Sequence, residues 1–242
     1  MLNYSDIFSG INRILFVAAH PDDVDVLYGG LLALLSQDKK EIFVLLTTNG
    51  GRGSKGNTIS EQDLGTIRLS EEHQALNILG VKNENFSTLN YLDGEVENNL
   101  ETIGQISYYI RIFQPNIVCT QQPHNNYILN PNSSFGYINH RDHRNTGQIT
   151  LDAVYPFSRD KSFFANQFSD PLIKEHHVKH VLLANTNKPN CVFDITNVVN
   201  KKRQALLSHQ SQFNSDIVNR ILENQAKDHK YYEEALYFQL PW

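Results

Sequence analysis

Apolar residues along the chain form short continuous runs, separated by longer segments with helical periodicity. Residues 12–18 and 41–48 are apolar nearly throughout, which is typical of strands buried on both faces of a parallel sheet. Residues 31–40, which follow Gly29 and Gly30, predict a helix between these two strands. A strand, a crossover helix and a second strand form the repeating unit of layered α/β proteins.

The same alternation continues along the rest of the chain. Helices are predicted over residues 60–79, 98–113, 141–154 and 197–222, and strands over residues 86–89, 116–121, 178–185 and 191–195. Residues 123–139 carry Pro, Asn, Ser and Gly without periodicity and predict a long loop, a rim or lid over any site nearby. The pattern predicts a Rossmann-like three-layer α/β/α sandwich with a mostly parallel sheet, in a single domain spanning residues 1–242.

Composition narrows the class of protein. The chain has 242 residues, 40% hydrophobic and 19% charged, which is ordinary for a soluble globular domain. A net charge of −5 gives no indication of a basic surface that would bind a nucleic-acid backbone. The only basic run, residues 201–203, is predicted to be a solvated helix face. Cys119 and Cys191 lie in predicted strands and are expected to be free thiols.

Membrane and secretion signals are missing from the sequence. No apolar stretch reaches the ~18 residues that span a bilayer, and the N-terminus lacks the basic and apolar regions of a signal peptide. We therefore expect a cytoplasmic protein without a membrane partner. The aromatic tail, residues 233–242, is expected to pack on the domain or on another subunit, which leaves a homo-oligomer open.

A polar motif follows the first predicted strand: residues 18–30 read AAHPDDVDVLYGG. Ligands of open α/β sheets bind outside the carboxyl ends of the strands. His20 and Asp23 are three residues apart, so an imidazole nitrogen and a carboxylate oxygen can reach one divalent metal. Asp22 is a second carboxylate beside them. No GxGxxG motif follows this strand, which argues against a dinucleotide site.

A second cluster, NHRDH, ends at His143. If His143 is the third ligand, two His and one Asp hold the metal and leave a position open for water, as in catalytic zinc sites. Such a metal lowers the pKa of its water toward ~7. Asp22 could then accept a proton as general base, and His140 could act as an electrophile or general acid.

Each motif alone is weak evidence for a metal site, because His beside Asp is common in a chain with 10 His and 26 acidic residues. An Asp after Pro is also a frequent turn residue or helix N-cap. The two motifs together are stronger, since both lie at predicted strand-to-helix junctions and jointly supply a ligand set with spare acid–base groups.

These motifs resemble those of the PIG-L/LmbE-like family of zinc-dependent N-deacetylases, whose hallmarks are AHPDD near the N-terminus and HPDH in the middle. Further similar segments are TTNGGRGS (47–54), IRLSEEHQALNILGV (67–81), YLDGEV (91–96) and FDITNVVNKKRQALLSHQSQF (193–213). The resemblance covers about residues 12–213 in the right order. These segments, matched in order, are far more specific than either metal motif alone.

The resemblance implies roles for individual residues. His20, Asp23 and His143 would bind Zn²⁺, with Fe²⁺ as an alternative. Asp22 would be the general base, and His140 would stabilise the oxyanion or protonate the leaving amine.

Two further positions match the family. Arg68 matches the arginine that begins the R-x-x-E helix of the family, and it would reach toward the substrate. The alternative is that Arg68 is a surface arginine paired with Glu71 or Glu72. Asp142 matches the acidic residue of HPDH and would orient a ligand histidine.

The sequence departs from the family at several positions. Val24 and then Asp25 follow the Asp pair where Glu is usual, Leu27 replaces a glycine, and Arg141 replaces the proline of HPDH. We expect Val24 to remove a charge near the metal and to alter substrate preference. All five proposed catalytic and metal positions are retained, so an inactive relative is disfavoured.

The resemblance implies a hydrolase that removes acetate from an N-acetylated amino sugar. Relatives act on N-acetylglucosamine linked to inositol lipids, inositol, malate or chitin fragments, and the malate conjugate of the bacillithiol pathway is the leading candidate. One alternative is a metal-dependent amidase for a non-sugar N-acyl substrate. A non-catalytic sugar-binding module is disfavoured because binding alone needs neither Asp22 nor His140.

Overall fold

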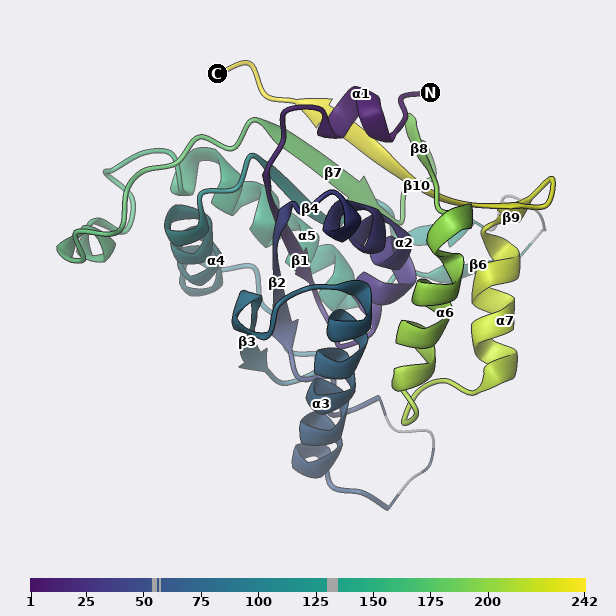
Figure 1. Ribbon diagram of the computed structural model, residues 1–242. Helices are drawn as coiled ribbons and strands as arrows, with labels where there is room; N and C mark the ends of the chain where they lie inside the picture. The colour runs from purple at the N-terminus through teal and green to yellow at the C-terminus, as the bar shows by residue number, and fades with distance from the viewer. Residues whose placement is uncertain (54–55, 57, 130–134) are drawn as a thin grey trace.

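The computed structural model describes residues 1–53, 56, 58–129 and 135–242 and is built on one central sheet (Figure 1). Its strands run in the order β3-β2-β1-β4-β7-β10-β8, and β9 pairs with β10. Their bounds are β1 Arg13–Ala18, β2 Glu41–Thr48, β3 Phe86–Tyr91, β4 Ile117–Gln121, β7 His180–Ala184, β8 Cys191–Asp194, β9 Ala226–Lys227 and β10 Lys230–Gln239.

The first five strands of this order are parallel, whereas β10 runs antiparallel to both β7 and β8. β1 lies between β2 and β4, with Phe16 opposite Val44 on one side and Cys119 on the other. The carboxyl ends of the parallel strands therefore meet at one edge, the lower edge in Figure 1. The predicted mostly parallel sheet is confirmed.

Helices cover both faces of the sheet (Figure 1). Their bounds are α1 Tyr4–Phe8, α2 Asp23–Gln37, α3 Glu61–Leu79, α4 Leu100–Phe113, α5 Arg141–Asp152, α6 Val199–Ser208 and α7 Ser215–Asn224. Neighbouring residues of β1 point to opposite layers: Phe16 packs with Leu31 of α2, whereas Val17 packs with Ile106 of α4 and Ile149 of α5. This alternation produces the predicted three-layer sandwich.

Two predicted helix boundaries are wrong. The helix expected from residue 31 begins at Asp23, and Gly29 and Gly30 lie inside it. Gly30 is needed for packing, because a Cβ there would lie 2.5 Å from the side chain of Ile195. The helix expected over residues 197–222 is two helices, α6 and α7, and Asn214 begins the second by accepting a hydrogen bond from the Ile217 N–H.

The aromatic tail completes the sheet. Strand β10 lies between β7 and β8, with Leu236 opposite Leu183 and Ala235 opposite Cys191. The tail thus packs on its own domain, one of the two alternatives expected for it. Cys119 and Cys191 are buried free thiols. Within the described residues, no helix combines the length and apolarity needed to cross a membrane.

The basic run at residues 201–203 is not a solvated face throughout. Lys202 is fully buried and donates to Glu233 Oε1 at 2.6 Å and to the Val26 carbonyl at 2.8 Å. Glu233 also accepts hydrogen bonds from the backbone N–H groups of Gly30 and Leu31. This buried ion pair joins α2, α6 and β10, three elements whose pairing cannot be read from local sequence.

Candidate active site

The AHPDD motif forms the tight turn between β1 and α2. The backbone N–H of His20 donates to Asp23 Oδ2 at 2.8 Å, and the backbone N–H of Asp23 donates to the His20 carbonyl at 3.2 Å. This turn folds the two side chains together, so that His20 Nδ1 lies 3.3 Å from Asp23 Oδ2. Both residues are buried, at 7% and 8% exposure.

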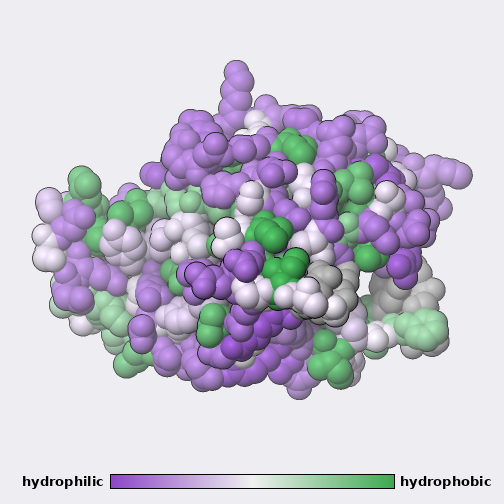
Figure 2. Space-filling view, turned by 90° about the horizontal axis from the view of Figure 1, so that it is seen from below, coloured by the Kyte–Doolittle hydropathy of each residue, from purple (hydrophilic) through white to green (hydrophobic). Residues whose placement is uncertain are grey.

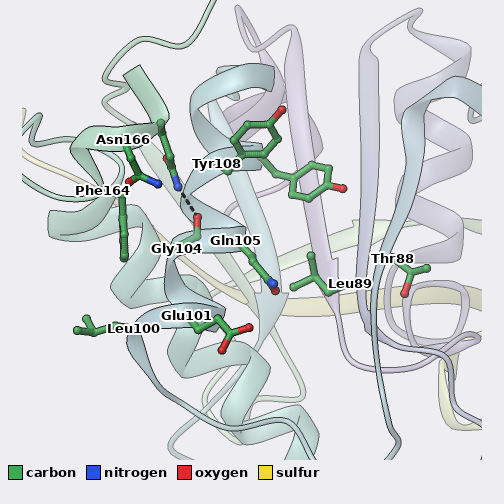
Figure 3. Close-up of a pocket in the computed structure, with 11 residues that line it drawn as sticks. Thr88, Leu89, Leu100, Glu101, Gly104, Gln105, Tyr108, Phe164 and Asn166 are labelled. Carbon is green, nitrogen blue, oxygen red and sulfur yellow. Dashed lines mark hydrogen bonds between the residues drawn. The ribbon is translucent and has the colours of Figure 1, made fainter. Parts of the chain in front are cut away.

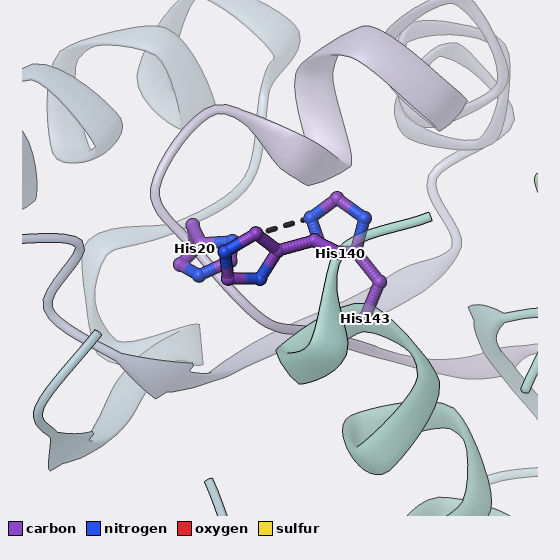
Figure 4. Close-up of side chains that lie close together, drawn as sticks. All are labelled: His20, His140 and His143. Atoms are coloured by element: carbon purple, nitrogen blue, oxygen red, sulfur yellow. Dashed lines mark hydrogen bonds between the residues drawn. The ribbon is translucent and has the colours of Figure 1, made fainter. Parts of the chain in front are cut away.

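His143 reaches the same point from the first turn of α5. Its Nε2 atom lies 3.2 Å from His20 Nδ1 and 3.2 Å from Asp23 Oδ1. Figure 4 shows the imidazoles of His20 and His143 close together, with His140 beside them. Zinc–ligand bonds of about 2.0–2.1 Å place tetrahedral donor atoms about 3.3 Å apart. These three side chains form a triangle of possible ligands, in which Asp23 faces His20 through Oδ2 and His143 through Oδ1.

Hydrogen bonds orient both histidines toward this point. His143 Nδ1 lies 3.2 Å from the side-chain oxygen of buried Asn139, which can only accept, so Nδ1 carries the proton and the Nε2 lone pair faces the triangle. His20 Nε2 lies 3.1 Å from Asp93 and 3.3 Å from Asp142, so a proton on Nε2 is held there while Nδ1 faces Asp23 and His143. Such partners fix the tautomer of metal-binding histidines.

Asp142 and Asp93 surround His20 from the side opposite the triangle. Asp142 is fully buried and accepts hydrogen bonds from the Gly94 and Val96 backbone N–H groups at 2.6 and 3.3 Å. Burial alone would lower the pKa of His20, but its contacts with Asp142, Asp23 and Asp93 raise it well above the usual value. Asp93 and Asn139 were not among the predicted site residues; Asp93 follows β3, at the same sheet edge.

Asp22 has an unusual backbone conformation beside the triangle. It occupies the N-cap position of α2 with φ +100° and ψ −25°, and its side chain makes no capping hydrogen bond. Its carboxylate instead accepts a hydrogen bond from Arg68 Nη2 at 2.9 Å, and 15% of the side chain stays exposed. Burial raises the pKa of Asp22, while the positive charge of Arg68 opposes the shift.

Arg68 is buried at 4% exposure and contacts three backbone or side-chain oxygens. Besides Asp22, it donates to the Gly50 carbonyl at 2.6 Å and to the Pro21 carbonyl at 2.7 Å. Gly50 has φ +65°, and a Cβ there would lie 2.5 Å from the guanidinium. The alternative of a surface arginine paired with Glu71 or Glu72 is wrong. A contact between Arg68 and substrate stays a prediction.

His140 is the N-cap residue of α5. Its Nδ1 atom accepts a hydrogen bond from the Asp142 backbone N–H at 3.2 Å, so a proton on the neutral ring must be on Nε2. Burial and then the neighbouring His20 and His143 lower the pKa of His140. The ring centroid lies 4.8 Å from that of His20. His140 is thus arranged as a neutral hydrogen-bond donor beside the other two histidines.

The predicted loop 123–139 contains a two-stranded hairpin, β5 Tyr127–Leu129 and β6 Gly136–Ile138; residues 130–134 lie outside the described residues. Asn139 fastens it by donating to the Asn125 carbonyl at 2.9 Å. The hairpin leads directly into His140, so it lies beside the histidines, and His124 is exposed. Figure 2 views the molecule from this edge and shows a largely hydrophilic face with scattered hydrophobic residues.

The departures from the family motifs do not disturb the predicted metal ligands. Val24 is buried in the hydrophobic core at 1% exposure, so it cannot contact a substrate. The expected effect of Val24 on substrate preference therefore has no support in its position. Arg141 donates to the Gly94 and Val96 carbonyls at 3.1 and 2.8 Å and pairs with Glu97 at 2.5 Å. It thereby holds the loop whose N–H groups bind Asp142.

A separate cavity of about 590 Å³ lies between α4, β3 and the segment around Phe164 (Figure 3). Tyr108, Gln105 and Leu89 are among its walls, and Gln167 on its rim donates to the Gly104 carbonyl at 2.9 Å. Its lining includes no histidine and no cysteine. A metal held by imidazole groups is therefore expected at the histidine cluster and not in this cavity.

The fold and site together define a Rossmann-like protein with a cluster of His20, Asp23 and His143 at the carboxyl ends of its strands. A family model, PIG-L (GlcNAc-PI de-N-acetylase), matches residues 15–154, which is more than half of the chain. The chain belongs to the PIG-L family, as the sequence motifs predicted.

The chain is also similar to individual proteins named as deacetylases. The chain is 30% identical over 210 residues to the diacetylchitobiose deacetylase of Thermococcus kodakarensis, covering 87% of this chain and 73% of the relative. It is 29% identical to the probable N-acetyl-alpha-D-glucosaminyl L-malate deacetylase 2 of Bacillus anthracis, covering 83% and 81%. The solved N,N'-diacetylchitobiose deacetylase of Pyrococcus horikoshii superposes with a TM-score of 0.83 at 28% identity, covering 96% and 85%. This likeness confirms the predicted fold.

Proposed function

We propose that this protein is a metal-dependent N-deacetylase that removes acetate from an N-acetylated amino sugar. The observation that carries the proposal is the triangle of His20, Asp23 and His143, whose side chains lie 3.2 to 3.3 Å apart through both Asp23 oxygens, beside the carboxylate of Asp22. Relatives named as deacetylases of N-acetylglucosamine compounds support the reaction class.

The donor set suits Zn²⁺, and the same imidazole and carboxylate groups also suit Fe²⁺. His20 would bind through Nδ1 and His143 through Nε2, because their other ring nitrogens face Asp142 and Asn139. A bound divalent cation supplies Lewis-acid activation of water and of the acetamide carbonyl. We propose zinc as the metal.

The remaining groups move protons and stabilise charge. Asp22 accepts a proton from the attacking water, whose oxygen bonds to the acetyl carbon. His140 donates a hydrogen bond from Nε2 to the acetyl oxygen as negative charge develops there. The carbon–nitrogen bond then breaks, Asp22 returns its proton to the leaving amine, and acetate and the free amino sugar result. The pKa of Asp22, raised by burial, suits this exchange of a proton.

The charges near the site favour a neutral sugar substrate. Arg52 pairs with Glu61 at 2.9 Å and with Glu95 at 2.7 Å, and it donates to the carbonyl of Asp93. Arg68 is paired with Asp22, and Arg141 with Glu97. Since each of these arginines already faces a carboxylate, they offer little net positive charge to an acidic aglycone. A second N-acetylglucosamine unit needs no such charge.

The malate conjugate is the second candidate, favoured by the similarity to the Bacillus anthracis relative. The test compares kcat/KM for diacetylchitobiose, N-acetylglucosaminyl malate, free N-acetylglucosamine and simple N-acetyl amines, with purified zinc-loaded protein and a chelated control. We expect acetate release that is highest with diacetylchitobiose. Preference for the malate conjugate would select the second candidate, and release from amines alone would select a non-sugar amidase.

A further inference from the structure

Helix α3 holds the backbone of Asp22 from behind the site. Glu72 is fully buried, and its Oε2 atom accepts a hydrogen bond from the Asp22 backbone N–H at 2.9 Å. Arg68, one turn earlier on the same helix, binds the Asp22 carboxylate and the preceding carbonyl of Pro21. One helix face thus contacts the N–H, the side chain and the preceding carbonyl of a single residue.

The conformation of Asp22 explains why such contacts are needed. A φ of +100° lies in the region that residues other than glycine rarely adopt, and it costs of order 1–3 kcal/mol. In the usual extended N-cap conformation, an aspartate carboxylate binds the first N–H groups of its own helix. The left-handed conformation instead turns the carboxylate away from α2 and toward Arg68, where it remains available to accept a proton.

A buried cluster lies behind Glu72. His209, from the end of α6, is fully buried, with Nε2 3.0 Å from Asp25 Oδ2 and 3.7 Å from Glu72 Oε2. Burial alone would lower the pKa of His209, but the hydrogen bond with Asp25 raises it. His209 therefore lies between Asp25 and Glu72, and it joins α2, α3 and α6 directly behind the site.

We propose that Glu72 is a positioning residue for the reaction, which keeps Asp22 in its left-handed conformation, and that His209 holds Glu72 in place. The inference rests on the proposed function, because the role of Asp22 as base belongs to that proposal. Glu72 and His209 are both buried, and in the proposed function neither binds the metal nor contacts the substrate. The inference gives each of them a role.

A double-mutant cycle tests this role. Glu72→Ala should lower kcat by roughly 10²-fold with little change in KM or metal content, since misplacing a reacting group by about 1 Å costs that much. In an Asp22→Asn background, Glu72→Ala should add a loss of no more than about twofold, because both changes remove the same contribution. Equal losses in both backgrounds, or loss of metal, would overturn the proposal.

The matched control is Glu71, the neighbouring buried carboxylate of α3, which binds the Ser211 N–H at 2.8 Å and hydroxyl at 2.6 Å. Glu71→Ala removes these two hydrogen bonds, one more than Glu72→Ala removes, without touching Asp22. Its losses should be independent of the residue at position 22. A Glu71→Ala loss that also vanishes in the Asp22→Asn background would mean that any damage to α3 acts this way, and the specific role of Glu72 would fall.

A readout that needs no activity separates this proposal from the proposed function. In metal-free protein, hydrogen exchange of the Asp22 amide should accelerate about tenfold or more in Glu72→Ala and stay unchanged in Glu71→Ala. Unchanged exchange in Glu72→Ala would reject the positioning role even if the protein is a deacetylase.

If Glu72→Ala does not fold, Glu72→Gln is the second variant. Its amide retains an accepting oxygen, so it should keep most of kcat, and a loss as large as that of Asp22→Asn would reject the role. A parent protein that releases no acetate defeats only the proposed function.

Discussion

His20 Nδ1 lies 3.2 Å from His143 Nε2, although the two residues are 123 positions apart in the chain. Parallel pairing of β1 with β4 brings this about, because His20 follows β1 and His143 lies in the first turn of α5, which follows β4 and the β5–β6 hairpin. The contact depends on topology and on the hydrogen bonds that orient each ring.

His143→Ala should abolish stoichiometric metal binding, because it removes one corner of the donor triangle. Elemental analysis of the dialysed protein measures this, with an expected change from about one zinc per chain to a small fraction. His124→Ala, which removes an exposed histidine of the neighbouring loop, is the matched control and should retain the metal. Full occupancy in His143→Ala would remove this residue from the ligand set.

Asp22→Asn should retain the metal and lower kcat by about 10² to 10⁴, the range typical of a lost general base. The amide keeps a hydrogen-bonding group near Arg68 but cannot take a proton at neutral pH. Metal content and kcat should be measured on the same preparation. If the metal is lost together with activity, Asp22 is a ligand and not the base.

The activity of His140 should depend on its neutral form. Because burial and the adjacent histidines lower its pKa, His140 is neutral above that lowered pKa and becomes protonated only as the pH falls through it. It therefore contributes to the acidic limb of the kcat/KM profile. His140→Ala should lower kcat by about 10²-fold or more, as for a lost oxyanion donor, and leave the basic limb in place. Disappearance of the basic limb in this variant would instead show that His140 acts as a protonated acid.

Arg68→Lys should reduce kcat for every substrate to a similar extent. A lysine cannot reach Asp22 and the Gly50 and Pro21 carbonyls together, because it lacks the planar fork of arginine. The ratio of kcat/KM for N-acetylglucosaminyl malate and free N-acetylglucosamine in parent and variant measures this. A larger loss on the malate conjugate would show that Arg68 reads an acidic aglycone.

Lys202→Met should destabilise the fold by about 3–5 kcal/mol, because it leaves the buried carboxylate of Glu233 without its ion-pair partner. Chemical denaturation measures the change in the free energy of unfolding. The matched control is Lys201→Met in the same basic run, which removes an exposed charge and should shift stability by less than about 0.5 kcal/mol. Similar values for the two variants would mean that the buried pair contributes little.

The sequence by itself determined the architecture and the principal groups of the site. Apolar runs at residues 12–18 and 41–48 predicted buried parallel strands, since only strands covered on both faces are apolar throughout. His20, Asp23 and His143 were predicted as ligands from motif spacing and family resemblance. The structure brings their donor atoms together, while metal binding by them stays a prediction.

Only the tertiary structure decided the contacts between distant elements. Local pattern placed Lys202 on a solvated helix face and Arg68 either near substrate or on the surface, yet both are buried against groups supplied by other elements. Glu72 and His209 lie in segments that resemble the family, but their contact with each other was not predicted, because the partners of a buried charge lie far away in sequence. Periodicity records which face of an element is apolar, whereas the left-handed conformation of Asp22 depends on side chains from another helix.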